Sequence, residues 1–195
     1  MKTNLTFLAI LFLAFTQLDA APDAKAFIDG NRTAFSTQNH KEAKGVNMEF
    51  SFPKGWVAKE GEKPNVVQKF VSESGLETAM ISVKTLPVPE GVPEGTKPTE
   101  EDMKEIFCED NLKGMILEGA KTITAKYSVT AERLGVVVET HSLSFMFMSG
   151  INMITVNFSV MGLPDSKTKV EDRVKEFRPI FMSMANTISL PDKWK

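Results

Sequence analysis

Apolar and polar residues alternate along several stretches of this chain, and such alternation is typical of strands with one buried face. From Val46 to Phe52 every second residue is apolar, and Pro53, Lys54 and Gly55 then interrupt the pattern. The same criterion predicts six further strands, at residues 56–59, 66–71, 78–85, 121–130, 136–148 and 151–161. The first four strands are expected to form an antiparallel meander. The last two are joined by a short turn and are expected in the centre of a sheet.

Two other stretches have apolar residues at the spacing of an amphipathic helix. The first is expected to start after Thr99, where acidic residues suit a helix N-terminus, and to stop by Gly119. Its apolar positions are Met103, Ile106, Phe107, Leu112, Met115 and Ile116. The second is expected to be capped by Asp165 or Ser166, with a kink or short break caused by Pro179. Its apolar positions are Val170, Val174, Phe177, Phe181, Met184 and Ile188.

The order of these elements indicates an α+β protein with an antiparallel β-sheet of six to seven strands flanked by helices. Residues 21–45 are mostly polar, and we expect them to be a flexible lead-in. Residues 46–195 are then expected to form a single domain, because this length is sufficient to bury a core.

The sequence FSFPKGW at Phe50–Trp56, the long hairpin with a glycine turn and the closing helix together resemble the PsbP-like α/β/α sandwich. The resemblance covers roughly residues 46–190 and is one of pattern. It implies that fold, which occurs in many exported bacterial proteins. It also implies a non-catalytic accessory or assembly role, and it assigns no function to individual residues.

The first twenty residues have the composition of an export signal. Lys2 is followed by an apolar run from Leu5 to Phe15, and Ala20 offers a cleavage site. The run is shorter than a bilayer-spanning helix, and no cysteine follows it that could carry the lipid of a bacterial lipoprotein. We therefore expect a cleaved signal peptide at residues 1–20 and a periplasmic or secreted protein without a membrane anchor.

Charge and cysteine content narrow the function further. The chain has 23 basic and 25 acidic residues, a near-neutral balance that argues against general nucleic-acid binding. Cys108 is the only cysteine, so no internal disulfide can form and stability must come from packing. Its place between apolar residues of the first predicted helix indicates a buried thiol rather than a nucleophile.

The few residues suited to catalysis or metal binding do not form a recognisable motif. Glu139 and His141 are expected to share a strand face, as a surface ion pair or as two ligands of a metal site. A zinc site needs at least three protein ligands, so the ion pair is favoured. His141 is also the only histidine of the predicted domain that could serve a hydrolase as a base. We assign no catalytic, cofactor-binding or metal-ligating residue.

Methionines are frequent around the predicted central hairpin and in the closing helix. In an exported protein their soft thioethers could hold copper(I), but they equally suit pliable core packing, which we favour because no histidine or cysteine accompanies them. The residues concerned are Met146, Met148, Met153, Met161, Met182 and Met184.

Binding surfaces remain the more informative candidates. Residues 86–98 are acidic and rich in proline, which predicts an extended exposed loop, either a connector or a site for a basic partner. The acids at Glu100, Glu101, Asp102, Glu105, Glu109 and Asp110 are expected to form a solvated helix face. The favoured hypothesis is a non-enzymatic accessory protein that binds another envelope protein. The alternatives are a carrier of a small apolar ligand between sheet and closing helix, and a hydrolase.

Overall fold

The structure is a computed structural model, and it describes residues 21–87, 90–91, 93, 115–117, 122–133, 136–162 and 169–193. The predicted signal peptide, Cys108, the acidic residues 100–110 and most of the loop at residues 86–98 lie outside the described residues. So do the first predicted helix up to residue 114 and the predicted caps Asp165 and Ser166.

Within this part of the chain, most strands form one antiparallel sheet of seven strands in the order β3-β4-β5-β9-β8-β7-β6. These strands are β3 (Val57–Lys59), β4 (Val66–Val71), β5 (Glu77–Thr85), β6 (Met115–Leu117), β7 (Thr122–Arg133), β8 (Val136–Ser149) and β9 (Asn152–Gly162). The hairpin of β8 and β9 is central, as predicted, and β9 pairs on its other side with β5. The predicted α+β class with an antiparallel sheet is confirmed.

The first predicted strand does not belong to this sheet. Strand β2 (Glu49–Pro53) pairs with β1 (Arg32–Ser36) in a separate two-stranded sheet, where Phe35 lies opposite Phe50. Phe50 and Phe52 of β2 are buried against Phe70 of β4, with Phe52 stacked on that ring at 4.3 Å and Phe50 tilted against it at 5.4 Å, so β2 packs on the main sheet instead of pairing with it. The expected four-stranded meander is therefore reduced to β3, β4 and β5.

The structure also corrects the expectation of a flexible lead-in. Residues 21–45 contain a short helix, α2 (Ala24–Ile28), the strand β1 and a 3₁₀ turn at Lys41–Ala43. Phe27 is 1% exposed and is part of the core. Because this segment buries an aromatic side chain and adds a strand, it belongs to the folded unit, and packed structure begins well before Val46.

The closing helix, α4 (Val170–Ala185), is confirmed with different ends. Its N-cap residue is Lys169, and it ends before Ile188, which was expected to be helical. It runs through Pro179 without the expected break. Pro179 is exposed, whereas Phe177, Ile180 and Phe181 around it are buried, so packing holds the helix together where the proline removes a backbone hydrogen bond.

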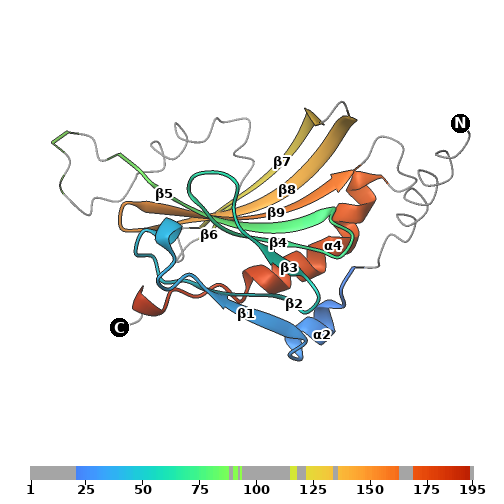
Figure 1. Cartoon of the computed structure of the whole chain (residues 1–195), viewed down its shortest axis with the longest axis horizontal. Helices are drawn as coiled ribbons and strands as arrows, with labels where there is room; N and C mark the ends of the chain where they lie inside the picture. The colour runs from blue at the N-terminus through green and yellow to red at the C-terminus, as the bar shows by residue number, and fades with distance from the viewer. Residues whose placement is uncertain are drawn as a thin grey trace, which may run out of the picture.

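The core lies between α4 and the inner face of the seven-stranded sheet. Figure 1 shows α4 and the β1–β2 pair on the same side of that sheet. Phe158 of β9 stacks on Phe181 of α4 with ring centroids 5.2 Å apart, and Phe145 of β8 meets Phe158 edge-on at 5.9 Å. Within the described residues, no helix is both long and apolar enough to cross a membrane.

The first predicted helix is partly wrong. Met115 and Ile116 were placed on its apolar face, but they lie in β6, which pairs with β7 through Met115–Thr124 and Ile116–Ile123. A short apolar run fits a helix or a strand equally well by its spacing, and the partner strand decides.

Candidate functional site

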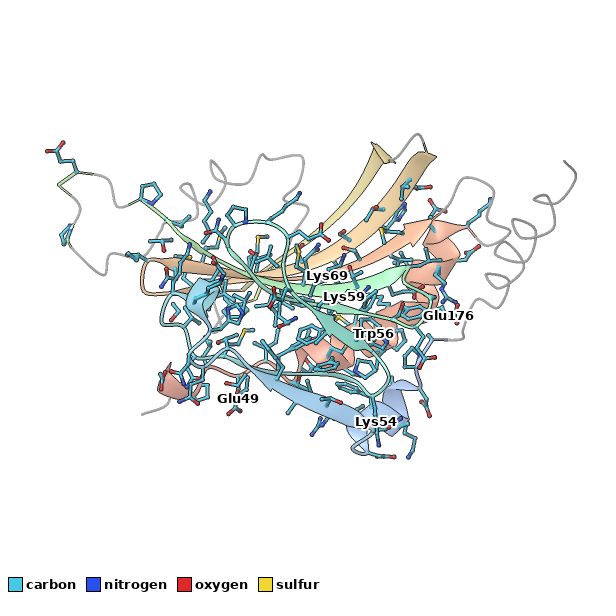
Figure 2. All side chains as sticks on the ribbon, viewed as in Figure 1. Glu49, Lys54, Trp56, Lys59, Lys69 and Glu176 are labelled. Atoms are coloured by element: carbon cyan, nitrogen blue, oxygen red, sulfur yellow. The ribbon has the colours of Figure 1, made fainter. Side chains whose placement is uncertain are left out.

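A pocket of about 170 Å³ lies where the N-terminal segment, two turns and α4 meet. Its aromatic walls are Trp56 and Phe177, and Lys54 stands at its edge; Trp56 and Lys54 are labelled in Figure 2. The complete lining is Pro22, Lys54, Trp56, Ser72, Glu73, Ser74, Glu77, Arg173 and Phe177. We call this the Trp56 pocket.

The turn that presents Lys54 and Trp56 is built by the residues that end β2. The amide of Trp56 donates to the carbonyl of Pro53 at 3.1 Å, and Gly55 between them has φ +99°. Only glycine adopts this conformation easily, and a Cβ on Gly55 would lie 2.9 Å from Oε1 of Glu73. The positive φ favours glycine at this turn, whereas the Glu73 carboxylate is the end of a flexible side chain that could move away.

A buried ion pair lies beneath the pocket. Arg173 Nε of α4 donates to Glu77 Oε1 of β5 at 2.7 Å, and the two side chains are 6% and 0% exposed. Glu77 Oε2 accepts hydrogen bonds from the hydroxyls of Ser72 at 2.7 Å and Ser74 at 2.6 Å. The Glu77 carboxylate thus has a partner on each oxygen, as a buried charge requires.

The Arg173 guanidinium has a less complete set of partners. Its Cζ lies 4.5 Å from the ring centroid of Phe177, and Nη1 donates to Glu176 Oε2 at 3.4 Å. Nη2 is buried, and none of the described residues accepts a hydrogen bond from it. The ring face of Phe177 compensates part of the charge through a cation–π contact.

The groups that line the pocket are held by contacts within the fold. Both oxygens of Glu77 are occupied by Arg173, Ser72 and Ser74, so the carboxylate is held in place. The lining includes Trp56, which is 7% exposed, Phe177, whose ring lies against the Arg173 guanidinium, and the exposed residue Lys54.

The structure brings Glu139 and His141 together, as the sequence predicted. His141 Nε2 lies 2.6 Å from Glu139 Oε1, and the side chains are 20% and 48% exposed. The two residues therefore make the expected surface pair. Among the described side chains, no three carboxylate, imidazole or thiol groups lie close enough together to hold a metal ion.

The sheet separates the predicted methionine group into two sets. Met146 and Met148 alternate with the core residues Phe145 and Phe147, so they lie on the sheet face opposite to α4. Met153 pairs with Met148 across the hairpin and shares that face, as does Met161 by alternation. Met184 is fully buried in the core on the α4 side, and Met182 is 37% exposed. The thioethers of the hairpin and of α4 do not converge on one site.

Sequence reasoning missed the Glu77–Arg173 pair because 96 residues separate its members. A signal was nevertheless present. Glu77 falls on the alternation of Ala79, Ile81 and Val83, which face the core, and Arg173 lies at helical spacing from Val170 and Phe177. Two opposite charges on two buried faces indicate a buried ion pair.

A second polar cluster was also missed, on the face of the central strands away from α4. Ser142 Oγ lies 2.9 Å from Ser159 Oγ, and Ser144 Oγ donates to Asn157 Oδ1 at 2.7 Å. Asn157 Nδ2 donates in turn to Ser159 Oγ at 3.0 Å. All four side chains are buried, and their mutual hydrogen bonds offset the cost of burial.

No protein-family model matches the chain, and no curated protein matches its sequence. Several solved structures match at low identity. A protein of Bacteroides thetaiotaomicron VPI-5482 is 13% identical with a TM-score of 0.41, over 73% of this chain and 44% of that one. The present chain therefore spans less than half of that protein's length.

Two other matches span nearly whole proteins. The Ran-binding protein Mog1p of Saccharomyces cerevisiae is 10% identical with a TM-score of 0.46, covering 82% of this chain and 95% of that one. LpqN of Mycobacterium tuberculosis, described as involved in cell envelope biogenesis, is 10% identical with a TM-score of 0.40, covering 87% and 97%. These are distant matches to the Mog1/PsbP-like fold, and they assign no function to this chain.

Proposed function

We propose that this protein is an exported, non-enzymatic accessory factor that binds another protein of the cell envelope. The observation that carries the proposal is the Trp56 pocket, a small hollow lined by Trp56, by the exposed residue Lys54 and by the buried Glu77–Arg173 pair. A hollow of about 170 Å³ is below the usual size of pockets that enclose a whole small molecule, but it can hold one side chain of a partner.

The proposal of export rests on the sequence of residues 1–20. Lys2, the apolar run and Ala20 follow the order of a signal peptide. The Glu139–His141 hydrogen bond alone does not favour a hydrolase, because it supplies only the acid and the base of a triad. A triad would need that ring to contact a serine hydroxyl.

The alternative function as a carrier of an apolar ligand requires space between the sheet and α4. Among the described residues this layer is filled by aromatic rings, with Phe158 stacked on Phe181 at 5.2 Å and Phe177 at 5.9 Å from Phe181. A ligand in this layer would have to displace packed rings, so protein binding is the better proposal.

The test is to isolate the tagged protein gently from an envelope fraction and to measure its mass by native mass spectrometry. We expect the mass of an additional protein subunit, and we expect Lys54→Glu to reduce that complex, because it reverses the charge at the edge of the pocket. Lys84→Glu is the matched control, since Lys84 is exposed near the far end of β5 from Glu77.

A bare monomer before and after chemical crosslinking would contradict the proposal. Equal loss of the partner in both lysine variants would show that net charge, and not the Trp56 pocket, governs binding. Retention of the protein in the cytosol would contradict export.

A further inference from the structure

The first described residue, Ala21, lies beside Glu176, which in turn contacts Arg173 of the ion pair beneath the Trp56 pocket. The backbone nitrogen of Ala21 is 2.8 Å from Glu176 Oε1. The other oxygen of Glu176 accepts from Arg173 Nη1 at 3.4 Å, and Arg173 Nε contacts Glu77 at 2.7 Å. Ala21 thus stands at the end of a row in which Glu77, Arg173 and Glu176 carry alternating negative, positive and negative charges.

The residues after Ala21 hold this position. Pro22 forms part of the pocket wall. The side chain of Asp23 caps α2 by accepting from the amide of Lys25 at 2.9 Å, and Phe27 is buried in the core. The segment is therefore fixed by three successive contacts, and the nitrogen of Ala21 is placed by the fold rather than by chance.

We propose that cleavage after Ala20 produces an ammonium group on Ala21 that binds Glu176 and completes this charge row at the edge of the Trp56 pocket. Hydrolysis of the Ala20–Ala21 peptide bond by a signal peptidase consumes one water, leaves a carboxylate on Ala20 and frees the amine of Ala21, which takes up a proton at neutral pH. The proposal rests on the export part of the proposed function, and it makes the mature N-terminus a structural part of the pocket.

Cleavage gives the Ala21 nitrogen a positive charge in addition to its contact with Glu176. Before cleavage the Ala21 nitrogen is a neutral amide that can donate to Glu176, and the row carries a net charge of one negative unit. After cleavage an ammonium stands in the same place, so the row is neutral and the hydrogen bond becomes charge-assisted. The side chain of Glu176 is 40% exposed, so the expected effect is that of a partly screened pair.

The experiment compares four forms of residues 21–195, namely the free amine and the N-acetylated chain, each with Glu176 or with Glu176→Gln. Acetylation keeps the N–H donor and removes the charge. We expect acetylation to lower Tm by about 2 °C in the chain with Glu176 and to have no effect in Glu176→Gln. Glu171→Gln is the matched control, because Glu171 is an exposed acid of the same helix, and acetylation should retain its full effect there.

A second measurement does not depend on stability. The rate at which an amine-specific reagent labels Ala21 at pH 7 is expected to rise about two- to five-fold in Glu176→Gln, because the carboxylate favours the unreactive ammonium form. Equal labelling rates, or an equal effect of acetylation in all variants, would overturn the proposal. An exported chain whose intact mass begins at another residue would also overturn it, whereas the absence of a partner protein would affect only the proposed function.

Discussion

At the scale of single residues, Arg173 and Glu77 form a buried ion pair. A buried carboxylate costs several kcal/mol unless it is paired and hydrogen-bonded, and here both oxygens have partners. The predictions included neither residue, and even the spacing that places each on a buried face could not show that the faces meet, because spacing along the chain carries no information on contacts between distant elements. The Glu139–His141 pair was predictable for the opposite reason, since it needs only the two-residue period of one strand.

Removal of the arginine should therefore be costly. We expect Arg173→Leu to lower the free energy of unfolding by about 3–5 kcal/mol, because Glu77 would keep its buried charge without the cation. Urea unfolding followed by circular dichroism measures the change. Arg178→Leu, at an exposed position of the same helix, should stay within about 0.5 kcal/mol. A similar loss in both variants would contradict the role of the buried pair.

The exposed pair of Lys175 and Asp172 on α4 should affect a pKa rather than the free energy of unfolding. The hydrogen bond and charge of Asp172 raise the pKa of Lys175 above 10.5, with a smaller contribution from Glu171. A raised pKa means that the pair contributes below pH 10.5 and that this contribution is lost as the pH rises through the folded-state value. We expect Asp172→Asn to return the pKa of Lys175 toward its ordinary value in an NMR titration.

Glu171→Gln should lower the same pKa by less, which provides the control. Because both members of the pair are exposed, neither substitution should change Tm appreciably. An unchanged titration of Lys175 in Asp172→Asn would contradict the contact.

At the scale of elements, local pattern predicted where strands and helices occur but not how they associate. The alternation at residues 46–52 correctly indicated a strand, yet β2 leaves the main sheet to pair with β1, whose own residues are mostly exposed. A strand with so little burial gives a weak sequence pattern, so its segment was interpreted as a lead-in. For α4, by contrast, the spacing of apolar residues predicted the helix correctly, and only the break expected at Pro179 was wrong.

Because α4 continues through Pro179, we infer that the proline destabilises this helix and that core packing keeps it intact. We expect Pro179→Ala to raise the free energy of unfolding by about 2 kcal/mol, because alanine restores an amide donor and removes the clash with the preceding turn. Chemical denaturation measures the gain. Ser183→Ala removes only the hydrogen bond from Ser183 Oγ to the Pro179 carbonyl, 3.0 Å long, and should change stability little. A loss of stability in Pro179→Ala would indicate that α4 depends on the proline.

At the scale of the whole molecule, the segment before Val46 contributes to the core. The predicted class and the central hairpin followed from periodicity, whereas the contribution of residues 21–45 did not, because the buried Phe27 and Ala43 lie in a polar stretch without a regular apolar spacing. Only their tertiary partners identify them as core residues. Arg32 adds a cation–π contact to the Phe27 ring at 5.8 Å.

Two neighbouring positions test this contribution. Phe27→Ala should lower the free energy of unfolding by about 3–5 kcal/mol, because it empties a buried site. Ile28→Ala should change it by less than about 0.5 kcal/mol, since Ile28 is 62% exposed. Thermal unfolding of both variants measures the difference, and equal stability would mean that the N-terminal segment does not support the fold.

The pairing of β5 with β9 has a consequence for chain connectivity. Residues 77–85 pair with residues 152–160 in the middle of the sheet, so backbone hydrogen bonds between β5 and β9 join the two halves of the chain. The peptide bond between Glu90 and Gly91 lies outside these paired strands. We expect fragments 21–90 and 91–195, produced separately in one cell, to assemble into a single folded particle that purifies as a one-to-one complex. The fold would then tolerate a break in the backbone, because the two fragments associate and neither has a complete core alone.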